Sequence, residues 1–326
     1  MGFGLLWYVT KDQDLNKMFG EFRTANYYWI GLAAIVGTLS HVARAARWNI
    51  IIKSMGYKTR LSTTFYAVMI GYFANMVVPR LGEVSRCGVI NKNSKIPFNI
   101  LLGTVVAERI FDSLCLLLLI ILVVFFQFEF LKGFLNKYIL HPLSLSFENN
   151  YITFIIVAVI IIVVIICLYV LYKTFNKHLK NKPFYFKLKR VFIGFAEGIK
   201  AIVHIKQKWA FIILTIAIWT LYFLMPFLCF FSLKDTSGLG VSAGFTILVM
   251  GSLGMVAPVP GGIGAYHFII ITTLVQLFAI NSASATSFAY ISHTSQMVLV
   301  AVLGLFSFAV LFLRNKKVKS ENNENN

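Results

Sequence analysis

The sequence predicts an all-α membrane protein, a polytopic helical bundle of about six to eight membrane segments. Two observations predict this class. The 326-residue chain is 58% hydrophobic and 13% charged, whereas soluble domains contain about 25% charged residues. Its mean hydropathy is +0.78, and long apolar runs alternate with short polar connections along the whole chain. A globular enzyme is therefore excluded.

Each apolar run is expected to be helical, because a lone strand cannot satisfy its backbone hydrogen bonds in lipid. The runs also lack the alternation of β-barrel strands. They lie at 27–48, 62–79, 100–126, 151–172, 209–233, 240–257, 264–281 and 285–313. Residues 1–10 are apolar as well, but reach only about half the ~20 residues that a span requires. We interpret them as the end of a first helix.

The basic residues predict the orientation of the bundle. The net charge of +18 arises largely in connections between apolar runs, so the positive-inside rule explains it without nucleic-acid binding. The connection 173–208 has ten Lys or Arg residues and a single acid, Glu197. We expect it to be cytoplasmic, together with residues 80–99 and the basic and polar tail 314–326. The protein is then a multi-pass protein of the cell (inner) membrane.

The connection 53–61 conflicts with a simple crossing pattern, because it is also basic and has no acid. If 53–61 and 80–99 lie on the same side, the run 62–79 must enter the membrane and return. Such a re-entrant segment is tolerated where protein or a cavity surrounds it. The alternative is a full crossing in which one short loop breaks the charge rule. We favour re-entrance.

Two ten-residue stretches indicate an internal repeat within a single domain. NMVVPRLGEV at 75–84 and GMVAPVPGGI at 254–263 align without gaps and share four residues at an offset of 179 (255 − 76): Met76/Met255, Val77/Val256, Pro79/Pro258 and Gly82/Gly261. The first repeat is predicted at 27–172 and the second at 209–313, joined by the loop 173–208. Loop charges give the repeats opposite orientations, and in inverted repeats the interrupted segments indicate the substrate site. The runs 240–257 and 264–281 could be re-entrant or fully crossing.

Three charged residues interrupt the run 100–126. Glu108 and Asp112 are four residues apart and share a helix face, with Arg109 to the side. Each charge near the bilayer centre costs at least about 2.5–3.5 kcal/mol, so the surplus acid requires a basic partner, for which Arg80 and Arg86 are the candidates. The cluster is either a helix-packing clamp or a functional site, and it could be both.

Arg44 and Arg47 end the first long run and precede Trp48. One interpretation makes the arginines snorkelling side chains and Trp48 an interface anchor. The other makes them a pair that holds a phosphate by bidentate hydrogen bonds. The candidate headgroup-binding residues are therefore Arg44, Arg47, Arg80, Glu83, Arg86, Glu108, Arg109 and Asp112.

The second half is chemically different, because residues 236–313 contain no Asp, Glu, Lys or Arg. Its polar residues include His293, Ser295 and Gln296, which can hydrogen-bond between helices. We assign the broken segments and a gate to Pro79, Gly82, Pro258, Pro260, Gly261, Gly262, Gly264 and His267. GGIG does not match a nucleotide-binding loop, and the four scattered cysteines have no metal-ligand spacing. We therefore expect no metal, no cofactor and no catalytic residue.

The chain resembles the membrane domain of lysylphosphatidylglycerol synthases and the related stand-alone flippase-like membrane proteins. The matching stretches are RAARW at 44–48, PRLGEVSR at 79–86, AERIFD at 107–112 and PVPGGIGAYH at 258–267. The resemblance implies a bacterial inner-membrane protein that handles phospholipid. In the full-length synthases this domain moves an aminoacylated lipid that a soluble C-terminal domain makes. We expect that domain to be missing here, and therefore no aminoacyl transfer by this chain alone.

The leading hypothesis is flippase-like translocation of a phospholipid or related anionic amphiphile. Arginines would engage the phosphate, and the carboxylates would hold the arginines or contact an amino headgroup. One alternative is a membrane component of aminoacyl-phospholipid synthesis that works with a separate transferase. Another is a non-transporting assembly protein. The partners considered are membrane phospholipid, a separate lipid-modifying transferase and a second copy of the chain, but no nucleic acid.

Overall fold

The computed structural model describes Gly4, residues 15–127 and residues 205–324. The described residues form helices joined by turns, with no strand among them, and five of these helices are long and apolar enough to cross a membrane. The predicted all-α polytopic bundle is thus confirmed. The predicted segment at 151–172 and most of the loop 173–208 lie outside the described residues.

The described helices fall into two groups with the same order: a long helix, two short helices and another long helix. A short amphipathic helix, α2 (Leu15–Thr24), precedes the first group. The first group is α3 (Tyr27–Ser54), α4 (Leu61–Val77), α5 (Leu81–Ser94) and α6 (Phe98–Phe126). The second is α10 (Lys208–Phe230), α11 (Val241–Val256), α12 (Ala265–Phe278) and α13 (Ser282–Glu324), with the 3₁₀ turn η2 (Pro260–Gly262) between α11 and α12.

The short helices of each group pack against each other as a hairpin. We call α4–α5 the first hairpin and α11–η2–α12 the second hairpin. Helices α5 and α12 have 14 residues each and end at left-handed residues, Lys95 (φ 58°) and Ala279 (φ 53°). Because Lys95 and Ala279 are equivalent positions, the segments that follow them in the two groups align at an offset of 184 residues (279 − 95). The offset exceeds the 179 seen in the aligned stretches because the connection 257–264 is longer than the turn 78–80.

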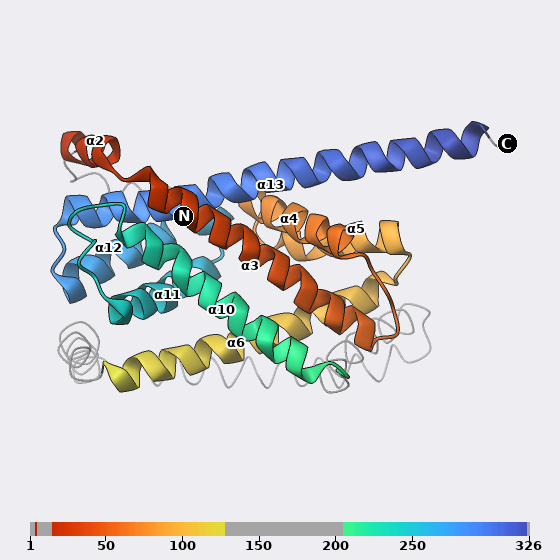
Figure 1. Ribbon diagram of the computed structural model, residues 1–326, viewed down its shortest axis with the longest axis horizontal. Helices are drawn as coiled ribbons and strands as arrows, with labels where there is room; N and C mark the ends of the chain where they lie inside the picture. The colour runs from red at the N-terminus through yellow and green to blue at the C-terminus, as the bar shows by residue number, and fades with distance from the viewer. Residues whose placement is uncertain (1–3, 5–14, 128–204, 325–326) are drawn as a thin grey trace, which may run out of the picture.

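The two hairpins enter the bundle from opposite ends (Figure 1). Both ends of the first hairpin lie at the end of the bundle where α3 terminates and α10 starts. A core that includes Ile51, Ile96 and Ile205 packs there. The second begins and finishes at the other end, where Asn26 N donates to Ser232 O at 2.9 Å. This arrangement is the predicted inverted repeat.

The tips of the two hairpins touch each other. A Cβ placed on Gly261 of η2 would lie 3.9 Å from the Cα of Met76 near the end of α4. The two stretches that align in sequence therefore touch in space. At 1.5 Å per residue, α4 with 17 residues and α5 with 14 are both shorter than the ~30 Å hydrocarbon core. This favours re-entrance for 62–79. In the second hairpin, η2 and α12 together are long enough to cross, so re-entrance and full crossing both stay open there.

Candidate functional site

The first hairpin closes tightly because two glycines meet where α4 and α5 cross. A Cβ on Gly82 would lie 2.1 Å from the carbonyl oxygen of Gly71, so only glycine fits there. The side chain of Asn75 accepts a hydrogen bond from Gly82 N at 2.7 Å and satisfies a backbone donor at the start of α5. Pro79 lies in the turn, and Arg80 has a left-handed backbone (φ 65°), an uncommon state for a residue with a side chain. The break observed in the sequence is therefore a strained turn.

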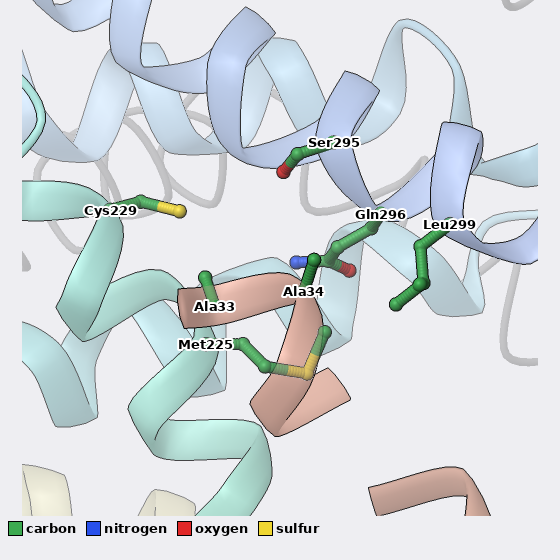
Figure 2. A pocket seen from close by; sticks show the side chains of 7 residues that line it. All are labelled: Ala33, Ala34, Met225, Cys229, Ser295, Gln296 and Leu299. Atoms are coloured by element: carbon green, nitrogen blue, oxygen red, sulfur yellow. The ribbon is translucent and has the colours of Figure 1, made fainter. Parts of the chain in front are cut away.

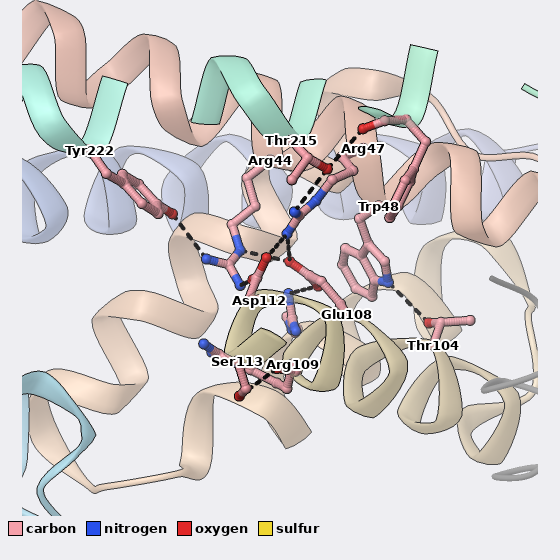
Figure 3. Close-up of polar contacts among 12 residues, drawn as sticks. Arg44, Arg47, Trp48, Thr104, Glu108, Arg109, Asp112, Ser113, Thr215 and Tyr222 are labelled. Carbon is pink, nitrogen blue, oxygen red and sulfur yellow. Dashed lines mark hydrogen bonds and ion pairs between the residues drawn. The ribbon is translucent and has the colours of Figure 1, made fainter. Parts of the chain in front are cut away.

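Two carboxylates on α6 face the arginines of α3 (Figure 3). Glu108 is fully buried, and its Oε1 lies 2.7 Å from Arg44 Nε and 3.4 Å from Arg47 Nη2. One turn further along α6, Asp112 Oδ2 lies 3.0 Å from Arg44 Nη2 and Asp112 Oδ1 lies 2.6 Å from Arg47 Nη2. The predicted common face of the acids is confirmed. Each acid bridges both arginines, which fixes their guanidinium groups.

Helix α10 completes the coordination of these arginines. Arg44 Nη1 donates to the hydroxyl of Tyr222 at 3.0 Å, and Arg47 Nη1 donates to Thr215 Oγ1 at 3.4 Å. Arg44 also lies 5.7 Å from the ring centroid of Tyr72 on α4. Sequence reasoning missed these three partners, because a Tyr or Thr within an apolar run has no charge to mark it.

Arg86 brings the first hairpin into the same cluster. Its Nη1 lies 2.9 Å from Glu108 Oε2, and its guanidinium carbon lies 4.7 Å from the ring centroid of Trp48. Of the two candidate partners for the surplus acid, the structure selects Arg86. We call Arg44, Arg47, Arg86, Glu108 and Asp112 the charged cluster. Three guanidinium groups meet two carboxylates in it, which leaves one formal positive charge.

One edge of the Arg86 guanidinium is free. The residue is only 4% exposed, yet its Nε and Nη2 have no hydrogen-bond partner among the described residues. These two nitrogens carry the parallel N–H groups with which arginine binds carboxylate or phosphate in a bidentate manner. Unsatisfied buried donors are costly, so this edge is suited to an anion.

The remaining charged candidates lie at the rim of the cluster. Arg109 Nη2 lies 2.9 Å from Glu83 Oε1, and the two side chains are 43% and 25% exposed. This pair joins α5 of the first hairpin to α6. Arg80 is exposed and makes no ion pair with the residues that the structure describes. The structure therefore does not join Arg80 to the other seven charged candidates.

The anchor interpretation of Arg47 and Trp48 is wrong. Both side chains are 0% exposed, so neither reaches the surface of the bundle. Arg47 is held by Glu108 and Asp112, and Trp48 Nε1 donates to Thr104 Oγ1 at 3.0 Å. The buried acids on α6 hold Arg47 inside the bundle, because a charge in an apolar core is stabilised chiefly by a paired charge.

The second hairpin holds the other predicted gate residues in an uncharged environment. Gly261, Gly262 and Gly264 all have positive φ, at 57°, 74° and 85°, so the glycines form the irregular connection between α11 and α12. Pro258 lies within this connection, and Pro260 begins η2. His267 Nδ1 accepts a hydrogen bond from Gly264 N at 3.4 Å, and His293 Nε2 lies 2.9 Å from Gly261 O.

In the repeat register, the charged cluster corresponds to neutral residues. Glu108 corresponds to Ser292 and Asp112 to Gln296, each at the offset of 184. Gln296 lines a small cavity of about 10 Å³ between α3, α10 and α13 (Figure 2), together with Ala33, Ala34, Met225, Cys229, Ser295 and Leu299. That volume suits about one water molecule. Among the described residues, no three His, Cys, Asp or Glu side chains are placed to hold a metal ion.

Comparison with known proteins agrees with this architecture. Residues 1–304 match the family described as "Lysylphosphatidylglycerol synthase TM region". The chain belongs to this family. The chain is also similar to a UPF0104 membrane protein of Methanocaldococcus jannaschii, 33% identical over 102 residues, which is 30% of this chain and 30% of the relative. No solved structure matches the chain. The family and the five long apolar helices make the chain a multi-pass membrane protein.

Proposed function

We propose that the protein moves a phospholipid, or a related anionic amphiphile, between the leaflets of a membrane. The observation that carries the proposal is the free edge of Arg86. It lies in a buried cluster with one surplus positive charge, on a hairpin whose tip meets that of the opposite hairpin.

The charged cluster matches a phosphodiester in geometry and charge. The Nε and Nη2 donors of Arg86 fit two non-bridging phosphate oxygens. A single negative charge on the ligand neutralises the cluster, whereas an unpaired positive charge remains in the protein alone. Glu108 and Asp112 position Arg44 and Arg47 and are themselves saturated by arginines. They therefore act as positioning residues, and an amino headgroup would have to contact Glu83 at the rim.

The opposed hairpins provide a route for the headgroup. Neither α4 nor α5 is long enough to span, and the two broken tips touch at Met76 and Gly261. Separating the tips would open a path for the headgroup from Arg86 towards the second hairpin, while the acyl chains remain in lipid. In the orientation that loop charge predicts, Arg86 lies nearer the cytoplasmic end.

Leaflet-resolved scrambling in liposomes tests this proposal. The purified protein is reconstituted with a fluorescent anionic phospholipid, and the fraction accessible to an external quencher is followed. We expect Arg86→Gln to slow translocation about tenfold or more, because charge-assisted hydrogen bonds contribute about 1.5–3 kcal/mol and 1.4 kcal/mol is a factor of ten. Arg86→Lys keeps the charge but loses the bidentate edge, so it should be intermediate.

Lys92→Gln is the matched control, since Lys92 is an exposed cation on the same helix. It should change the rate by less than about twofold, in line with the small energies of surface charges. Equal rates for wild type and Arg86→Gln, with both proteins folded by size-exclusion chromatography, would refute the assignment of the site. No lipid movement by the wild type would refute the function itself.

A second candidate follows from the family, whose description names a lipid synthase. The chain would then serve aminoacyl-phospholipid synthesis as the membrane component of a separate transferase. Thin-layer chromatography of lipids from cells that express the chain alone, or with a candidate transferase, separates the alternatives. A new aminoacyl lipid with the chain alone would contradict the translocation proposal in its simple form.

A further inference from the structure

Two histidines occupy the positions that an ion pair occupies in the first repeat. His267 on α12 corresponds to Glu83 on α5, and His293 on α13 corresponds to Arg109 on α6, each at the offset of 184. Their rings lie 4.7 Å apart at 70°. Like the Glu83–Arg109 ion pair, the His267–His293 pair joins the second helix of a hairpin to the long helix that follows.

The hydrogen bonds of the histidines fix where their protons lie. Gly261 O can only accept, so His293 donates from Nε2 at 2.9 Å. Gly264 N donates to His267 Nδ1 at 3.4 Å, so the proton of a neutral His267 is on Nε2. That nitrogen is buried and has no partner among the described residues. Both rings thus hold the backbone of the connection 257–264.

Among the residues that the structure describes, the surroundings of the pair are uncharged. Helices α4, α11 and α12 contain no Asp, Glu, Lys or Arg, and neither does α13 before Arg314. The titratable groups that face the pair are the phenols of Tyr266 and Tyr290, whose rings contact the histidines, and the thiol of Cys229, which packs in the core with Tyr266. Without a counter-ion, a charged imidazole is strongly disfavoured in the closed arrangement.

We infer that the His267–His293 pair is a proton-binding site that fills when the second hairpin separates from α13. In the closed arrangement the buried rings have no counter-ion, and two imidazolium rings 4.7 Å apart would repel each other. Separation of the second hairpin from α13 parts the two rings and lets water reach them. The Gly264–His267 contact lies within the hairpin and is not needed for this effect. Protonation of the pair and closure of the second hairpin therefore exclude each other. The inference rests on the proposed function for the existence of an open state.

The sign of the pH dependence follows from this exclusion. In the open state the histidines reach water and titrate with an ordinary pKa of about 6.5. Below that pH the open state binds more protons than the closed state, so its population rises as the pH falls. At pH 8 both histidines are neutral in the open and in the closed state, so proton binding does not lower the stability of the closed state relative to the open state. Acid on the side that the second hairpin faces would thus promote its opening.

Hydrogen–deuterium exchange of the backbone at 257–264 measures this opening without any lipid movement. Exchange in nanodiscs is compared at pH 5.5 and pH 8.0 after correction for intrinsic rates. We expect opening to increase about tenfold at the lower pH for one histidine titrating at about 6.5. The double variant His267→Gln, His293→Gln should lose the increase. Glu83→Gln should alter exchange at 79–86 and leave the pH response of 257–264 intact.

The outcomes distinguish this inference from the proposed function. A wild-type exchange ratio near one would overturn the proton site, even if scrambling proceeds, and so would a tenfold ratio in the folded double variant. If the double variant does not fold, the wild-type ratio decides. A pH-dependent second hairpin in a protein that moves no lipid would retain the proton site and refute the transporter.

Discussion

The two repeats share a backbone arrangement and differ in the chemistry that they carry. Glu108 and Asp112 in the first repeat correspond to Ser292 and Gln296 in the second. The second repeat keeps its hairpin against the following long helix with neutral bonds, such as that between Tyr266 and Ser292. Charges are therefore not required to build this fold. Since buried ion pairs are weak evidence for stability, their presence in one repeat alone is in keeping with the headgroup-binding role that we propose.

The sharpest test of this comparison removes the central acid. Glu108→Gln leaves three buried guanidinium groups with a single carboxylate, so we expect a loss of about 3–5 kcal/mol in the free energy of unfolding, as for other broken buried ion pairs. Ser292→Ala at the equivalent position removes two neutral hydrogen bonds, with the Tyr266 hydroxyl and with Ala289 O, and should cost about 1–2 kcal/mol. Denaturant unfolding in detergent measures both. Equal losses would show that the repeats do not differ as described.

A second test compares how tightly the hairpins cross. Ala at Gly82 places a Cβ 2.1 Å from the Gly71 carbonyl oxygen, whereas Ala at Gly251 of α11 meets the Tyr266 ring at 3.0 Å. A backbone oxygen cannot move without the helix, so Gly82→Ala should cost about 1–3 kcal/mol and Gly251→Ala clearly less. Gly88 on α5 has open space around it, so Gly88→Ala is the control and should be neutral or stabilising. The opposite ranking in thermal unfolding would contradict the crossing geometry.

The smallest effect is expected at the rim. Glu83→Gln removes the ion pair with Arg109, but both side chains are substantially exposed. Solvent screens such pairs, so the free energy of unfolding should change by less than about 1 kcal/mol. Scrambling rates should respond more than stability does, if the pair controls access to Arg86. A large loss of stability with unchanged transport would make the pair purely structural.

Parts of the site follow from local sequence alone. Glu108 and Asp112 share a face because they are one helical turn apart, and the surplus acid demands an arginine. The break at Pro79 and Gly82 and its partner around Gly261 are also visible as interrupted apolar runs. These features depend on positions within one helix or one turn, which the sequence specifies directly.

Other parts depend on how separate helices are placed against each other. The choice of Arg86 over Arg80 depends on how α5 packs against α6. Arg86 lies within α5 and reaches Glu108, whereas Arg80 is an exposed residue of the turn that precedes α5. The burial of Arg47 and Trp48 depends on α6 lying against α3, and no local pattern encodes that packing. The same holds for Tyr222 and Thr215, which become ligands of the arginines through the crossing of α3 and α10.

Helix α13 contacts both hairpins, and its stiffness has a consequence for the barrier function of the membrane. His293 bonds Gly261 of the second hairpin, and Gly304 packs against Phe73 of the first. These residues are 11 positions apart, a fixed spacing of about 16 Å along one helix. A rigid helix that stays packed on one hairpin limits how far the other can withdraw, so we expect the two ends never to be open together. In the proposed translocation, ions would then find no continuous water column, and lipid would cross without dissipating the membrane potential.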